Sequence, residues 1–128
     1  MARLRLIDEM TGDMIEPLED RDVANFGRAE DNDIPIPSVG VQGEIDRAGR
    51  AMTFTRAQIS AFGMGRTISR YHGMLAIVEG RVYIYDKKSA LGTYVNGDRI
   101  ENLRFLRLND RDEITLGEGY KLKVEIDE

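Results

Sequence analysis

Five arginines gather in a part of the chain that contains no acidic residue. The window from Arg47 to Val78 carries a charge of +5, whereas the whole chain of 128 residues has a net charge of −5, so the remainder carries −10. Clustered guanidinium groups suit a compact anion such as a phosphate, which they bind through charge-assisted hydrogen bonds. A solvated basic loop without a ligand is the alternative. The acidic remainder repels nucleic acid, so we expect no nucleic-acid partner. The arginines of this window are Arg47, Arg50, Arg56, Arg66 and Arg70.

Residue types that catalyse reactions or bind metals are scarce. The absence of Cys excludes disulfides and thiolate metal sites, and the single histidine, His72, excludes multi-histidine metal centres. No pair of nucleophile and base is recognisable, so we expect no enzyme, no catalytic residue, no metal and no cofactor. Gly63 and Gly65 lack the Gly-Lys-Ser/Thr that completes a phosphate-binding loop, so a nucleotide site is not expected either.

The elements that must position these residues follow the period of β-strands. Short runs rich in Val, Ile, Tyr and Thr are separated by turn residues, and Glu79-Gly80 and Asn96-Gly97 are typical of tight hairpins. Around eleven such strands predict an all-β sandwich or barrel. The clearest runs are Leu4–Ile7, Met14–Leu18, Asp22–Phe26, Met74–Val78, Arg81–Tyr85, Thr93–Val95, Asp98–Ile100, Phe105–Leu108, Glu113–Leu116 and Tyr120–Ile126.

The length of the chain and its hydropathy predict one domain over residues 1–128. The apolar runs are too short to cross a membrane, and the first residues lack the pattern of a signal peptide. We therefore expect a cytoplasmic protein with no membrane partner.

One stretch, residues 39–67 approximately, breaks the strand rhythm and is rich in Gly, Ala and Arg. Loops longer than about 12–15 residues are uncommon in small domains and tend to be functional or disordered. Within it, residues Thr55–Phe62 could form two helical turns, with Thr55 as the N-cap and Gly63 as the stop signal.

Four short motifs occur in a fixed order along the chain, each at a turn between predicted strands. They are Gly27-Arg28, then Ser69-Arg70-Tyr71-His72, then Gly92-Thr93-Tyr94-Val95-Asn96-Gly97, then Asp112-Glu113-Ile114-Thr115-Leu116-Gly117. Together they resemble the pattern of the forkhead-associated (FHA) domain family over essentially the whole chain outside residues 39–67. The resemblance implies an eleven-stranded sandwich of the SMAD/FHA type, whose apical loops bind phosphothreonine peptides.

The resemblance also assigns roles to individual residues. It implies that Arg28 and Ser69 contact the phosphate and that Arg70 faces the peptide, and arginine and hydroxyl donors are what a phosphate requires. A surface ion pair of Arg28 with Glu30, Asp31 or Asp33 is the alternative. Structural roles, which brace or shape the loops, fall to Gly27, His72, Gly92, Thr93, Asn96 and Gly97.

The sequence departs from the family pattern just before Gly92. Where the family usually carries an Asn whose amide holds the peptide main chain, this chain has Ala90 and Leu91. Leucine neither donates nor accepts, so two hydrogen bonds to a bound peptide would be missing, at about 0.5–1.5 kcal/mol each. We expect binding to be weakened roughly ten- to hundredfold.

The second departure is the insertion, since forty residues lie between Arg28 and Ser69. Three interpretations stay open. The insertion extends the pocket, with Arg66 or Arg56 as accessory phosphate contacts; or it covers the pocket as an internal ligand; or it has no role. Threonines for an internal ligand are Thr53, Thr55 and Thr67.

These observations favour a phosphothreonine-peptide-binding module in protein–protein interaction or signalling, whose partner is a phosphorylated protein or peptide. The alternative is a degenerate, phosphate-independent scaffold that mediates protein assembly, for which an apical Leu91 suits an apolar contact. The sequence does not determine the oligomeric state.

Overall fold

A computed structural model of the chain describes residues 3–10, 12, 14–19, 22–37, 42–45, 51–53 and 67–127. These residues form thirteen short strands, joined by turns and loops, and include no helix. Inward and outward side chains alternate along the strands, as in the buried–half-buried pattern of the first one. The strands are β1 (Arg3–Asp8), β2 (Met14–Glu19), β3 (Val23–Gly27), β4 (Ile34–Pro35), β5 (Gln42–Ile45), β6 (Ala51–Thr53), β7 (Gly73–Val78), β8 (Arg81–Asp86), β9 (Thr93–Val95), β10 (Asp98–Arg99), β11 (Phe105–Leu108), β12 (Glu113–Leu116) and β13 (Tyr120–Asp127).

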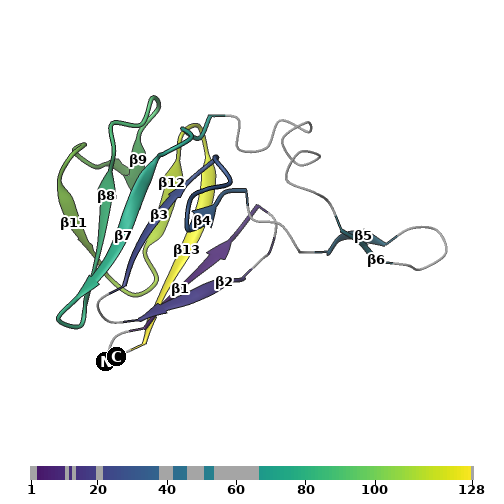
Figure 1. Ribbon diagram of the computed structural model, residues 1–128, viewed down its shortest axis with the longest axis horizontal. Coiled ribbons are helices and arrows are strands. Elements are labelled where there is room, and N and C mark those ends of the chain that lie inside the picture. The colour runs from purple at the N-terminus through teal and green to yellow at the C-terminus, as the bar shows by residue number, and fades with distance from the viewer. Residues whose placement is uncertain are drawn as a thin grey trace.

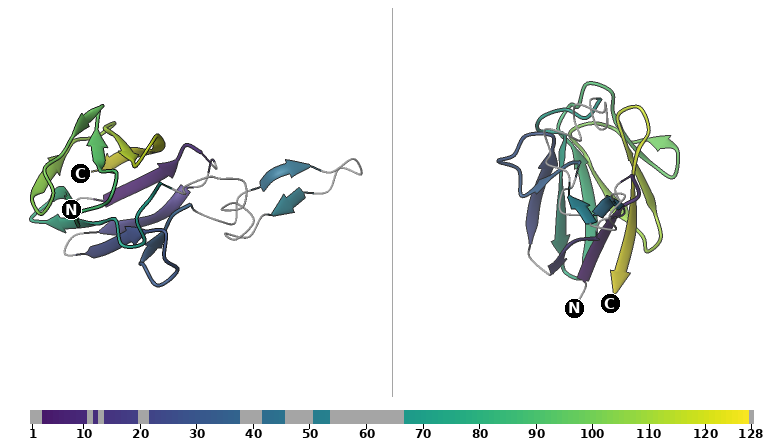
Figure 2. Two further views of the ribbon diagram at one scale, coloured as in Figure 1. Left: turned by 90° about the horizontal axis from the view of Figure 1, so that it is seen from above. Right: turned by 90° about the vertical axis from the view of Figure 1, so that its right-hand side faces the viewer.

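Two sheets form a sandwich. One has six strands in the order β10-β9-β12-β13-β1-β2, and the other has five in the order β11-β8-β7-β3-β4. All pairs are antiparallel except β3 with β4. The two views of Figure 2 show the sheets lying face to face. Six and five strands make eleven, so the predicted eleven-stranded sandwich is confirmed.

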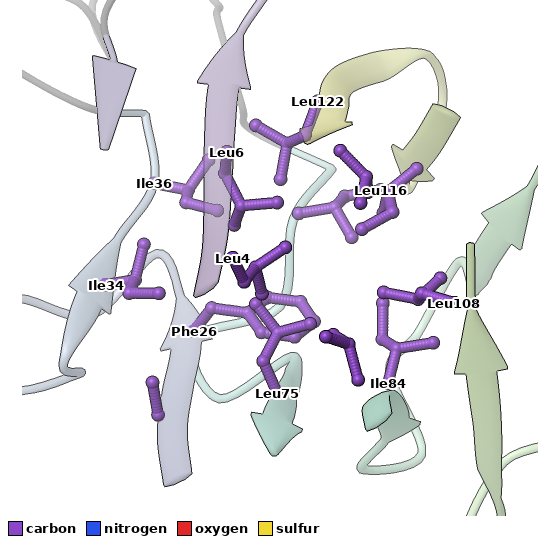
Figure 3. Packing of buried hydrophobic residues seen from close by; sticks show 14 of the residues in the cluster. Leu4, Leu6, Phe26, Ile34, Ile36, Leu75, Ile84, Leu108, Leu116 and Leu122 are labelled. Atoms are coloured by element: carbon purple, nitrogen blue, oxygen red, sulfur yellow. The ribbon is translucent and has the colours of Figure 1, made fainter. Parts of the chain in front are cut away.

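The core lies between the two sheets and is almost entirely aliphatic (Figure 3). The β1 residues Leu4 and Leu6 pack across the sandwich from Phe26 and Leu75, and all four side chains are at most 2% exposed. Burying side chains of this size contributes about 1.5–3 kcal/mol each. This rigid core holds the ends of the strands in place and therefore also the loops that leave them.

The two predicted hairpin turns are present. Glu79 and Gly80 join β7 to β8, and Asn96 and Gly97 join β9 to β10, all four with positive φ angles. A two-residue turn with positive φ at both positions matches the right-handed twist of the strands that it connects.

The region of residues 39–67 contains the third sheet, a hairpin of β5 and β6 that pairs with neither large sheet. The sequence did not predict these two strands, because neither run alternates polar and apolar residues. The helix predicted over residues 55–62 lies outside the described residues. Within the described residues, no helix is long and apolar enough to cross a membrane.

Candidate functional site

Three loops meet at one end of the sandwich, at the top of Figure 1. They are residues 28–33 after β3, residues 67–72 before β7, and residues 87–92 between β8 and β9. The first two loops are joined by backbone hydrogen bonds, among them Arg28 N to Ser69 O at 3.1 Å. Segments forty residues apart in the sequence therefore form one continuous surface.

The guanidinium group of Arg28 is fixed by a hydrogen bond from one of its three nitrogens. Its Nε donates a hydrogen bond to the carbonyl oxygen of Ile68 at 3.1 Å, while the residue as a whole stays exposed. Two of the alternative ion-pair partners bond elsewhere: Asp31 accepts hydrogen bonds from Tyr71, and Asp33 accepts one from the backbone of Asn25. Within the described residues, the two terminal amino groups of Arg28 have no protein partner, so they can bind an anion from solution.

Ser69 is fixed in a similar way. Its Oγ accepts a hydrogen bond from Ala90 N at 2.9 Å, and its backbone N donates to His72 Nδ1 at 3.1 Å. Because the hydroxyl oxygen is used as an acceptor, its proton remains available to donate to a ligand. The residue is half-buried, so this proton lies close to the surface.

His72 is fully buried and connects the second loop to the third. Nδ1 accepts from Ser69 N, so the neutral ring carries its proton on Nε2, which lies 3.0 Å from both the oxygen of Gly92 and Oγ1 of Thr93. Thr93 Oγ1 in turn donates to Asp86 Oδ2 at 2.7 Å. The sequence assigned His72 and Thr93 to structural roles, and in the structure both are buried and hydrogen-bonded beneath the loops.

Asp86 is the acceptor on which this network ends. It is 2% exposed and also accepts hydrogen bonds at 2.7 Å from the hydroxyl and the backbone N of Ser89. Burial alone would raise the pKa of this carboxyl, but the hydrogen bonds from Ser89 and Thr93 outweigh burial and lower the pKa. Sequence reasoning missed both Asp86 and Ser89.

The pKa of His72 is lowered because burial disfavours the charged ring more than Asp86 and the Gly92 carbonyl favour it. With a folded pKa below the ordinary 6.5, the unfolded chain binds more protons in the interval between the two values. Stability therefore rises with pH through this interval and falls as the pH drops below about 6.5.

We expect the free energy of unfolding, measured in urea, to decrease between about pH 7 and pH 5.5, before most carboxylates titrate. His72→Gln, which cannot gain a proton, serves as the matched control and should show a smaller decrease. Equal pH dependence of the two proteins would contradict a role for this ring.

Gly27 is required by close packing of the first two loops. A Cβ at this position would lie 2.2 Å from the carbonyl oxygen of Arg70, a distance that no side chain tolerates. A Cβ on Gly92 would lie 2.8 Å from Nε of Arg99, and its φ of +90° also favours glycine. Asn96 and Gly97 form the β9–β10 turn, farther along the chain from the loops of the site.

A domain family with this architecture matches the chain. The model of the FHA domain matches residues 24–117, which is more than half of the sequence. The chain belongs to the FHA domain family. A search of curated proteins found no match.

Solved FHA structures share the fold. The chain is 21% identical to an Arabidopsis thaliana FHA domain, with a TM-score of 0.68. The match covers 99% of this chain and 86% of the Arabidopsis chain. It is 22% identical to the N-terminal FHA domain of Rad53p from S. cerevisiae, solved with a phosphothreonine peptide, with a TM-score of 0.62 and coverage of 97% and 93%. EmbR of Mycobacterium tuberculosis, solved with a low-affinity phosphopeptide, is 22% identical with a TM-score of 0.64; the match covers 96% of this chain but only 24% of EmbR.

Arg70 lies beside the other two candidate residues of this FHA domain and is exposed. Its carbonyl oxygen accepts hydrogen bonds from Ala29 N and from the Asn32 side chain, at 3.1 and 2.8 Å. Asn32 is buried, and its Nδ2 also donates to Ala29 O. Sequence reasoning missed Asn32, which ties the two loops together under Arg70.

Ala90 and Leu91 occupy the exposed part of the third loop, and 38% of Leu91 is accessible. The backbone of Ala90 supports Ser69, but neither side chain offers a polar group to a ligand. The accessory candidates Arg56 and Arg66, together with Thr55, lie outside the described residues. Thr67 is described, and its Oγ1 accepts a hydrogen bond from Glu118 N at 2.9 Å.

Proposed function

We propose that this FHA domain binds a phosphothreonine-containing segment of a partner protein, with Arg28, Ser69 and Arg70 around the phosphate. The observation that carries the proposal is the pre-positioned pair of donors. Arg28 is anchored through Nε with its terminal amino groups unpaired among the described residues, and Ser69 is anchored through its oxygen with its proton available. Donors fixed before binding lose little conformational entropy when a ligand arrives.

The phosphate supplies the matching chemistry. A phosphate monoester has three acceptor oxygens and nearly two negative charges at pH 7. The guanidinium of Arg28 and the hydroxyl of Ser69 offer charge-assisted and neutral hydrogen bonds to it. Arg70 adds a second positive charge, and the acidic body of the protein disfavours polyanions elsewhere on the surface. The protein is on this basis a binding module for signalling or assembly.

The test is a fluorescence-anisotropy titration of phosphothreonine peptide libraries, with the same peptides unphosphorylated or carrying phosphoserine. We expect micromolar binding that requires the phosphate. Equal affinity for phosphorylated and unphosphorylated peptides, or no binding of any phosphopeptide, would refute the proposal.

Leu91→Asn should strengthen phosphopeptide binding by about tenfold, because an amide supplies one donor and one acceptor to the peptide main chain. Leu91→Ala is the matched control, since it removes the apolar side chain without adding a polar one. The titration above measures both variants. If the Asn variant binds no better than the Ala variant, the peptide main chain does not run beside this position.

A further inference from the structure

The two large sheets have four edges, and three of them are protected against pairing with another chain. The edge strand β2 contains Pro17, which lacks an N–H, and β4 is only two residues long and contains Pro35. The edge strand β10 is also two residues long, and both are charged. Short strands, prolines and charges are the usual means of blocking unwanted edge pairing.

The fourth edge strand, β11, contains no proline and is longer than two residues. Its one charged residue is Arg107. The strand has four residues, and it pairs with β8 and with no other described strand. Figure 1 shows it at the outer margin of the sandwich. Phe105 and Leu106 are 53% and 41% exposed, which is unusual for adjacent large apolar residues on a strand.

The register with β8 places the side chains of β11 on alternate faces. Leu106 lies opposite the buried Ile84 and so faces the inside of the sandwich, whereas Phe105 lies opposite Tyr85 on the outer face. Phe105 packs against the Tyr85 ring, with centroids 4.7 Å apart. Arg107 also faces outward and makes no ion pair with any described residue.

The sandwich is open beside Leu106. A cavity of about 690 Å³ lies along β11. Its apolar lining is Leu106 and Phe105 of β11, Val95 of β9 and Ile100 after β10, and its charged lining is Asp98, Arg99, Glu101 and Arg104. Because this cavity borders the unpaired edge, Leu106 is accessible even though it faces inward. A side chain added at this edge could bury apolar surface there.

We propose that β11 pairs antiparallel with β11 of a second copy, about a two-fold axis through Leu106. In an antiparallel pair, the side chains of two opposed residues lie on the same face of the sheet. Because faces alternate along β11, two opposed residues are an even number of positions apart, so the two-fold axis passes through the residue midway between them. With the axis at Leu106, the two Leu106 side chains meet at the cavity, and Phe105 of each copy lies opposite Arg107 of the other. This arrangement creates two cross-strand cation–π pairs and leaves no like charges opposed.

The neighbouring registers are worse. With the axis at Arg107, two guanidinium groups would face one another, which destabilises a cross-strand pair. With the axis at Phe105, Arg107 would lie opposite Leu103, which is outside the strand, and the two Phe105–Arg107 pairs would be lost. The surface is thus self-complementary in one register, as a two-fold dimer interface requires. The resulting sheet is continuous over both copies, and the loops that carry Arg28 and Ser69 take no part in it.

Disulfide trapping tests the register directly, because the chain has no cysteine of its own. Opposed residues in antiparallel strands have Cα atoms about 4.5–5.5 Å apart, within the range of a disulfide. Leu106→Cys should therefore form a covalent dimer under mild oxidation. Val23→Cys is the matched control, since Val23 is 58% exposed on β3 of the same sheet and should cross-link at least about tenfold more slowly.

Sedimentation velocity over a range of concentrations tests the interface without cross-linking. The unmodified chain should form dimers, and Leu106→Lys, which opposes two lysines, should weaken them at least about tenfold, whereas Val23→Lys should not. Arg107→Glu gives a second substitution, at an exposed residue, that should also weaken the dimer, so the test does not depend on Leu106→Lys folding. A monomer at every concentration, with equal cross-linking of the two cysteine variants, would overturn the proposal. Phosphopeptide affinity per site should be the same in Leu106→Lys, so failure here is separable from failure of the proposed function.

Discussion

Arg28→Ala should weaken phosphothreonine-peptide binding by about a hundredfold. The substitution removes two terminal amino groups that have no partner among the described residues, and it removes the Nε–Ile68 hydrogen bond that positions them. Hydrogen bonds to charged groups contribute about 1.5–3 kcal/mol each, and each 1.4 kcal/mol corresponds to a tenfold change in affinity. Titration of one phosphopeptide against both proteins measures the difference.

Arg28→Lys separates charge from geometry. Lysine keeps the positive charge but cannot reproduce the planar fork, so we expect an intermediate loss of about tenfold. Arg81→Ala is the matched control for net charge, because Arg81 is exposed at the β7–β8 turn, at the opposite end of β7 from the loops of the site. Equal affinity of Arg28→Ala and Arg81→Ala would show that the phosphate is not held by Arg28.

The strands were predictable because their signals are local. In β13, Leu122 and Val124 are buried and alternate with lysines, as the sequence pattern requires. Asn96-Gly97 is a turn signal that acts over two residues, and the structure shows the expected positive φ angles. The resemblance of four ordered motifs to the FHA family then predicted that these strands form an eleven-stranded sandwich.

The hydrogen bonds under the site could not be predicted, because they join distant parts of the chain. The anchor of Arg28 lies on Ile68, forty residues away, and Asn32 bonds to Arg70 across a similar distance. An Asp at the end of a strand is usually exposed, so nothing local indicates that Asp86 is buried. Nor does a sequence show which strand ends a sheet, which is why the exposed edge of β11 was missed.

Asp86→Ala should destabilise the fold by about 3 kcal/mol. It leaves three donors without their acceptor, two from Ser89 and one from Thr93, in a buried site. Each unsatisfied buried donor costs about 1–3 kcal/mol, although hydroxyl groups can partly reorient. Asp86→Asn keeps the shape and one acceptor oxygen, so its cost should be nearer about 1 kcal/mol. Urea unfolding measures all three proteins.

Asp86→Ala should also weaken phosphopeptide binding. A loss of global stability alone would not weaken binding in a protein that is still folded. Asp86 positions Ser89, and the next residue, Ala90, supports the Ser69 hydroxyl through its backbone N. Asp98→Ala, an exposed carboxylate on β10, is the control and should change stability by less than about 0.5 kcal/mol. If Asp86→Ala lowers stability but leaves the affinity of the folded protein unchanged, the third loop holds Ser69 without help from Asp86. If affinity falls together with stability, the buried carboxylate is part of what keeps the phosphate donors in place before a ligand arrives.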